Sequence, residues 1–241
     1  MKKKVYFSLN FNRKNRAKKD IKFIIFHYTG MQSEIDSIKR LTDSKSKVSC
    51  HYLINRKGSV FQLIEDNKVA WHAGKSKWKN FTNLNQNSIG IELVNKGHKN
   101  GYQSFSKNQI RSLISLCKKL KKKYNIKKQN FLGHSDIAPQ RKIDPGEKFP
   151  WKKISKYHLG HWYLKRKVNV PIKNHRQIRN LFFKNLFRIG YRYFKIKEKN
   201  TKDKLVIKAF QRRYLPNKIS GVLDLETLKI SLILADSTKT T

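Results

Sequence analysis

Cysteine and long apolar runs are both scarce in this sequence of 241 residues. Its two cysteines, Cys50 and Cys117, are too few for a disulfide framework and do not form a metal-binding CxxC pair. No apolar run approaches the roughly 18 residues needed to span a membrane, so we expect no transmembrane segment. Strand and helix patterns are nevertheless clear, although only 38% of the residues are hydrophobic, and they indicate a folded protein.

Acidic residues are also few. Fifteen aspartates and glutamates stand against 56 lysines and arginines, which gives a formal net charge of +41. Such a surface attracts polyanions: nucleic acid, anionic membranes or an acidic cell-wall polymer. The sequence has no zinc-finger spacing and no aromatic RNA-binding motif, so it predicts no specific nucleic-acid partner. A basic nucleic-acid-binding protein stays open as an alternative hypothesis, with weak and salt-sensitive binding.

The N-terminus begins like a signal peptide but does not continue as one. Lys2, Lys3 and Lys4 give a basic start, yet the apolar stretch at residues 5–9 is too short for the core of a leader. No small-residue cleavage site follows it. The sequence therefore predicts a cytoplasmic protein, and secretion or envelope association by a non-standard route is the alternative.

Strand and helix patterns alternate up to about residue 150. Apolar runs predict strands at 23–26, 51–55, 59–64, 89–94 and 130–133, the second and third of which form a β-hairpin. Helices are expected after Ser33 and after Ser106, the latter with a capping box between Ser106 and Gln109. This alternation predicts an α/β fold with a central mixed β-sheet flanked by helices.

Two histidines and one aspartate stand where strands end. His27 closes the first predicted strand, His134 follows the last, and Asp144 returns in a proline-bounded loop. Two imidazoles and a carboxylate with an open fourth position form the arrangement by which catalytic zinc activates water. We therefore expect a zinc hydrolase with one Zn²⁺ per chain held by these three residues. His51 and His72 are rival ligands; His51 is expected to be structural, and His72 to lie in a loop lining a cleft.

Five motifs occur in order along the chain: Ile24 to Gly30, Val48 to Ile54, Trp71-His72-Ala73-Gly74, Ser88 to Leu93, and Gly133 to Gly146. Together they resemble the type-2 N-acetylmuramoyl-L-alanine amidases, a zinc family that also includes peptidoglycan recognition proteins and phage-type lysozyme amidases. The resemblance covers about residues 20–155 and is nearest to the anhydromuramoyl-peptide amidases of cell-wall recycling. It implies hydrolysis of the amide between N-acetylmuramic acid, or its 1,6-anhydro form, and L-alanine in peptidoglycan or muropeptides.

The resemblance also implies residue roles. Glu92 matches the glutamate that activates the water, and Lys142 matches the basic residue that stabilises the oxyanion. The residues support Glu92 independently, because a carboxylate inside an apolar strand is costly to bury without a purpose. Phage-type members carry a catalytic tyrosine where this chain has Cys50, so their tyrosine mechanism is not transferred. Cys50 is expected to be a buried filler.

The motifs also indicate which residues surround the substrate. We expect Trp71, His72, Asn87 and Arg141 to line the groove. Asp136 is expected to order the loop that carries the second histidine. A non-catalytic peptidoglycan recognition protein is the main alternative function, and the full set of metal ligands disfavours it.

After residue 158 the pattern changes. Helices are predicted at about 177–190, 202–214 and 224–235, the last with Asp224 as its N-cap. They resemble a three-helix peptidoglycan-binding module. The predicted organisation is a loose basic arm (1–20), a zinc amidase catalytic domain (21–158), a linker (159–176) and a peptidoglycan-binding-like helical bundle (177–236).

Overall fold

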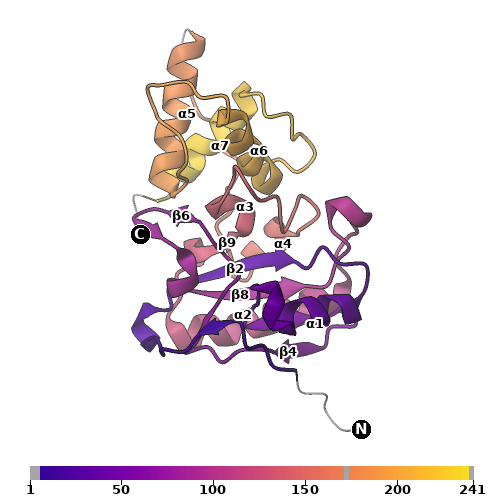
Figure 1. Cartoon of the computed structure of the whole chain (residues 1–241). Coiled ribbons are helices and arrows are strands. Elements are labelled where there is room, and N and C mark those ends of the chain that lie inside the picture. Colours follow the sequence, from indigo (N-terminus) through magenta and orange to yellow (C-terminus); the bar gives the residue numbers. More distant parts are fainter. Residues whose placement is uncertain (1–5, 171–173, 239–241) are drawn as a thin grey trace.

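A five-stranded sheet forms the centre of the computed structural model, which describes residues 6–170 and 174–238 (Figure 1). Lys2, Lys3 and Lys4 of the predicted arm and Pro171 of the predicted linker lie outside these residues. The strand order is β4-β3-β8-β2-β9. The strands are β2 (Phe23–Tyr28), β3 (Tyr52–Ile54), β4 (Val60–Gln62), β8 (Ser88–Leu93) and β9 (Phe131–Gly133). Only β4 runs antiparallel to its neighbour, so the predicted mixed sheet is confirmed.

Shorter elements surround this sheet. Two small antiparallel ladders pair β1 (Phe11–Asn12) with β5 (Val69–Ala70), and β6 (Lys77–Trp78) with β7 (Phe81–Thr82). The 3-10 turns are η1 (Lys18–Asp20), η2 (Ser44–Ser46), η3 (Leu84–Asn87), η4 (His98–Asn100) and η5 (Lys128–Asn130). Every helix in the described ranges is too short or too polar to traverse a bilayer.

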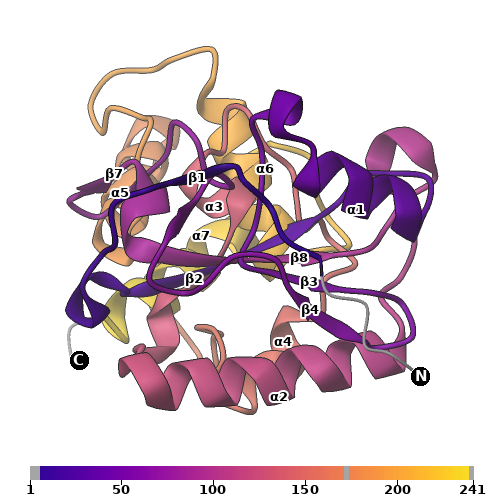
Figure 2. The ribbon, with the colours of Figure 1, turned by 60° about the horizontal axis from the view of Figure 1, so that its bottom comes forward.

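The alternation of side chains along β2 divides the structure into two layers. Ile24 and Phe26 face one side, where α2 (Lys107–Tyr124) and α4 (Trp151–Ser155) cover them. Phe23 and Ile25 face the other side. His27 has the same parity as Phe23 and Ile25 and therefore points into this second layer. The helix α2 lies on the opposite side of the sheet (Figure 2).

Helix caps follow the sequence closely. Ser33 accepts a hydrogen bond from the backbone N–H of Asp36 and starts α1 (Glu34–Thr42), as predicted. Ser106 caps α2 by accepting from the N–H of Gln109. The expected capping box is wrong in its second half, because the Gln109 side chain donates to the carbonyl of Ile54 and fastens α2 to the sheet instead.

The C-terminal helices are α5 (His175–Ile189), α6 (Asp203–Tyr214) and α7 (Leu225–Asp236). Asp224 caps α7 as predicted, by accepting from the N–H of Thr227. One hydrophobic cluster runs from Phe23 and Ile25 of the sheet to Phe182 and Phe210 of these helices. The bundle is therefore packed onto the sheet layer that contains His27.

The expectation of a loose N-terminal arm is wrong for its described part, residues 6–20. Arg16 is 9% exposed, and its guanidinium donates to the backbone carbonyls of Asp66 and Ser88. Burial lowers the pKa of Arg16 to about 10, against the raising effect of Asp66. A buried guanidinium is retained only when its donors are paired. Because basic residues are so frequent in the sequence, nothing there distinguishes Arg16 as a residue with a structural role.

Candidate metal centre and active-site pocket

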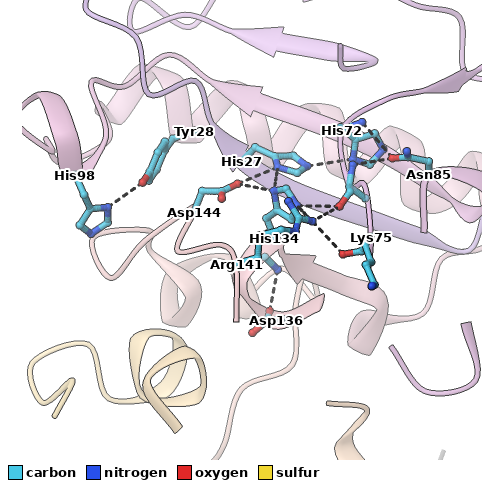
Figure 3. Close-up of polar contacts among 12 residues, drawn as sticks. His27, Tyr28, His72, Lys75, Asn85, His98, His134, Asp136, Arg141 and Asp144 are labelled. Atoms are coloured by element: carbon cyan, nitrogen blue, oxygen red, sulfur yellow. Dashed lines mark hydrogen bonds and ion pairs between the residues drawn. The ribbon is translucent and has the colours of Figure 1, made fainter. Parts of the chain in front are cut away.

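Three side chains from separate elements meet at the carboxyl end of the parallel strands (Figure 3). His27 is near the end of β2, His134 opens α3 (His134–Ile137) directly after β9, and Asp144 lies in the following loop. His27 Nδ1 is 2.9 Å from Asp144 Oδ2 and 3.0 Å from His134 Nδ1. His134 Nδ1 is 3.1 Å from the same carboxylate oxygen. The sequence prediction that these three residues converge agrees with this geometry.

Hydrogen bonds assign the tautomer of His27. The hydroxyl of Ser88 donates to the carbonyl of Leu84, so its oxygen can accept from His72 Nε2–H at 3.2 Å. His72 Nδ1 is then an acceptor, and it receives His27 Nε2–H at 3.1 Å. His27 Nδ1 therefore carries a lone pair and no proton.

His134 reaches the same state by a different route. In the neutral ring that carries its proton on Nε2, this N–H donates to the carbonyl of Ala73 at 3.0 Å and Nδ1 is bare. Three acceptors, the two Nδ1 atoms and one oxygen of Asp144, thus lie about 3 Å apart with no hydrogen between them. Such a cluster is repulsive unless the three atoms share a cation. The donor set fits a divalent metal ion.

The charges of the site agree with that fit. Burial lowers the pKa of His27 to about 4, and the neighbouring His134 adds to this effect. Burial alone would raise the pKa of Asp144, but positive charge at His134 and His27 holds it well below its ordinary value in the metal-free site. When both Nδ1 atoms are bare, a bound cation would supply that positive charge instead. At neutral pH His27 is neutral and Asp144 is ionised, which are the states that metal ligands require.

The two rival histidines support this centre without joining it. His72 lines the pocket, as expected, but lies behind His27. It fits there because residue 90 is glycine; a Cβ at Gly90 would clash with the imidazole of His72. His51 accepts from the N–H of Gly90 at 3.0 Å and faces Arg16 with its other nitrogen, so it has the structural place that was expected.

Glu92 lies directly beside His27, because the two residues are register partners on β8 and β2. Its Oε2 is buried and has no hydrogen-bond partner within residues 6–170 and 174–238. Burial raises the pKa of Glu92 to about 8; Asp144 adds to this, whereas Lys142 opposes it. Lys142 is half-buried and lines the same pocket. An unpaired carboxylate next to a lysine is therefore available for proton transfer.

The pocket has a volume of about 470 Å³ and includes Trp71 and Arg141 in its wall. The indole N–H of Trp71 donates to Asn12, and the guanidinium of Arg141 donates to the carbonyls of Ala73 and Lys75.

The expectation for Asn87 is wrong, because this residue is absent from the pocket wall. Asn87 is the last residue of η3, immediately before β8, and its amide donates to the carbonyl of Asp20.

Two groups that hold the metal-binding histidines were not predicted from the sequence: the hydroxyl of Ser88 and the backbone carbonyl of Ala73. Ser88 carries a signal that could have identified it, because strand periodicity puts it on the same side of β8 as Gly90 and Glu92. The carbonyl of Ala73 carries no sequence signal, since any residue supplies the same group.

Asp136 ties the ligand loop to the C-terminal helices. Its Oδ2 accepts from the N–H of Gly133 at 2.8 Å and from the guanidinium of Arg213. Its other oxygen accepts from the hydroxyl of Tyr191. The Asp136 and Arg213 side chains are 1% and 2% exposed, so this ion pair is fully buried between the sheet and the bundle.

Comparison with known proteins places the chain among amidases. A family model described as N-acetylmuramoyl-L-alanine amidase matches residues 17–147. The N-acetylmuramoyl-L-alanine amidase AmiD of Escherichia coli (strain K12) is 36% identical over 226 residues, which cover 88% of this chain and 81% of AmiD. The 1,6-anhydro-N-acetylmuramyl-L-alanine amidase AmpD of Haemophilus influenzae is 41% identical over 108 residues, 44% of this chain and 56% of AmpD.

A solved structure agrees over most of the length of the chain. The complex of E. coli AmiD with its substrate anhydro-N-acetylmuramic acid-L-Ala-D-γ-Glu-L-Lys matches with a TM-score of 0.79 and 33% identity. The match covers 94% of this chain and 93% of that one. It confirms the predicted fold class, and it includes the C-terminal helices as well as the sheet.

Proposed function

The chain belongs to the N-acetylmuramoyl-L-alanine amidase family and has that activity, and from this premise we propose that it works with one zinc ion per chain. His27, His134 and Asp144 would hold the ion. The observation that carries this proposal is the set of three unprotonated acceptors about 3 Å apart. Bound zinc lowers the pKa of a water ligand to about 7 and polarises a carbonyl oxygen.

Glu92 would transfer the protons in this reaction, and Lys142 would stabilise the negative charge that develops on the substrate. Glu92 Oε2 accepts a proton from the attacking water and returns it to the departing amide nitrogen of L-alanine. Burial raises the pKa of this carboxyl toward neutral pH, the range in which a group can both accept and return a proton. The ammonium of Lys142 stabilises the oxyanion that develops at the amide carbonyl, an effect on the order of 3–4 kcal/mol for such groups.

We propose anhydro-muropeptides as the substrate class. The relative AmiD has been solved with anhydro-N-acetylmuramic acid-L-Ala-D-γ-Glu-L-Lys, which carries free carboxylates on its peptide. The pocket of this chain has basic side chains in its wall to receive them: Arg40, Lys99, Arg141 and Lys142. Trp71 would offer an apolar surface to the sugar or the peptide stem. His72 acts on the ligand His27 in this scheme and not on the substrate.

Three broader features remain proposals. The boundaries 21–158 and 177–236 define a catalytic part and a bundle that would bind wall polymer. A sedimentation assay with purified peptidoglycan tests the second role. A cytoplasmic location is tested by cell fractionation.

The activity is tested by mass spectrometry of products from a defined anhydro-muropeptide. We expect release of the L-Ala-peptide, loss of activity with a chelator, and recovery on adding zinc. Glu92→Gln should retain the metal but lose activity by about 10²–10⁴-fold, the usual contribution of a general base. Full activity of Glu92→Gln would remove Glu92 from the mechanism. Unchanged activity in a metal-free preparation would reject zinc.

A further inference from the structure

The outer side of α2 carries no acidic side chain. Its exposed charged residues are all cations. Lys123 pairs with Asp66, and the other five are Lys107, Arg111, Lys118, Lys119 and Lys122. Their spacing, largely of three, four and seven residues, puts them on one stripe of the helix. Residues 93–135 contain no aspartate or glutamate.

The neighbouring helix α4 extends this surface. Lys152, Lys153 and Lys156 are exposed along and just after it. Lys118 Nζ of α2 lies 4.7 Å from the ring centre of Tyr157, so the two helices adjoin. We call the five cations of α2, these three lysines and Tyr157 the basic face. Within the described chain none of its eight cations forms an ion pair.

The basic face and the active-site pocket lie on opposite sides of the sheet. α2 and α4 cover the layer of Ile24 and Phe26. The pocket is lined by His27 and by residues of α1, and Figure 2 shows α1 and α2 on opposite sides of the sheet. An extended anion can therefore occupy the basic face without covering the pocket.

The shape and composition of the basic face favour binding to a flat anionic surface over binding to a polynucleotide. An 18-residue helix is about 27 Å long, and its cations point outward from two adjoining helices. All but one of the cations are lysines. The lysine ammonium is a compact charge and lacks the planar guanidinium with which arginine forms paired hydrogen bonds to bases and phosphates. Tyr157 is the one aromatic side chain of the basic face and Lys118 lies over one side of its ring, so the face has no row of rings on which successive bases could stack. At 41% exposure this tyrosine suits the headgroup region of a bilayer.

We propose that the basic face binds the anionic phospholipid headgroups of a membrane surface, with the pocket turned away from the bilayer. Each lysine near an anionic bilayer contributes about fivefold to the binding constant. Clusters of four to eight lysines or arginines on a helix surface are typical of segments that bind anionic lipids. This attachment is independent of the amidase reaction.

Vesicle sedimentation tests the proposal. The full chain is mixed with vesicles of phosphatidylcholine containing 30% phosphatidylglycerol, and with pure phosphatidylcholine vesicles. The face variant carries Lys118→Gln, Lys119→Gln, Lys122→Gln and Lys153→Gln. A control variant with the same net charge carries four changes on exposed lysines of the bundle: Lys184→Gln, Lys199→Gln, Lys202→Gln and Lys229→Gln. Circular dichroism melting shows whether both variants fold.

We expect binding to the anionic vesicles only, with a loss of about 10²–10³-fold in the face variant, which lacks four lysines, and less than about threefold in the control. Binding should also weaken steeply with added salt. An equal loss in both variants would mean that net charge alone attracts the protein, and would overturn the proposal. Binding of a 20-base-pair DNA duplex through the same lysines, without binding to vesicles, would overturn it in favour of a polynucleotide.

Discussion

At the level of single residues, His72 shows how a side chain outside the metal centre fixes its chemistry. The chain of hydrogen bonds from Ser88 through His72 to His27 determines which nitrogen of His27 is bare. Such partners orient metal ligands, and removing them typically costs about 10–100-fold in metal affinity. His72 is therefore a positioning residue.

Two substitutions test this role. His72→Leu removes the acceptor for His27 Nε2–H, so zinc affinity should fall by about 10–100-fold. His72→Asn puts an amide oxygen near the position of Nδ1 and should restore most of that loss. Competition with a chromophoric chelator measures both affinities. Equal affinities for the leucine variant and the wild type would reject the positioning role.

Glu92 gives a second prediction, on stability against pH. Its pKa rises from 4.5 in the unfolded chain to about 8 in the folded, metal-free protein. Below about pH 4.5 the carboxyl is protonated in both states and its burial costs little. Between pH 4.5 and 8 the unfolded state ionises first, so the folded protein loses stability as the pH rises. Above about pH 8 the cost is complete.

Glu92→Gln removes this cost. In the presence of chelator we expect the variant to melt about 5–10 °C higher than the wild type at pH 9, and at a similar temperature at pH 4.5. Thermal melting across this pH range measures the difference. Glu65→Gln is the control, because Glu65 is exposed and should change neither value. A difference that does not vary with pH would contradict the burial of an uncompensated carboxyl.

How far the sequence predicts the site also depends on individual residues. His27, His134 and Asp144 were predictable because strand ends and a proline-bounded loop limit where they can point. The role of His72 was not, since it depends on the missing side chain of Gly90 in a different strand. Asn87 was misplaced because the register of one residue decides whether a side chain faces the pocket or the turn before β8.

At the level of elements, the buried pair of Asp136 and Arg213 joins the ligand loop to α6. Arg213 also donates to the carbonyl of Phe131 and lies 3.9 Å from the ring centre of Trp151. The loop that carries His134 is thus held from two sides. Sequence patterns predicted both elements, but a pair 77 residues apart carries no local signal.

Arg213→Met should destabilise the protein by about 3–5 kcal/mol, because it leaves the carboxylate of Asp136 buried and unpaired. Adding Asp136→Asn should recover most of this loss, since the amide can still accept from the N–H of Gly133. Urea unfolding measures both free energies. Arg166→Met serves as the control, because its ion pair with Asp236 is about half exposed and is worth at most about 1 kcal/mol. A loss in Arg213→Met no larger than in the control would mean that the pair contributes little.

At the level of the whole molecule, the sheet and the bundle share one hydrophobic core. Linker composition predicted a boundary at 159–176, yet Leu159 is 1% exposed and His161 8% exposed. The first residues of this segment therefore pack as interior structure, whereas Leu164 a few residues later is 85% exposed. Composition shows which residues are polar but not which of them a second layer will cover, so the continuity of the core was not predictable.

Removing the bundle should consequently unfold the remainder. A chain ending at residue 158 would expose Phe23, Ile25, Leu132 and Ile137, all of which lie in the shared core. Each fully buried side chain of this size contributes about 1.5–3 kcal/mol, so four of them match the 5–15 kcal/mol that stabilises a typical domain. We expect the fragment to lack a cooperative melting transition by circular dichroism, even when Asp136→Asn removes the unpaired charge. A fragment that melts cooperatively within a few degrees of the full chain would instead show that the bundle is an independent module.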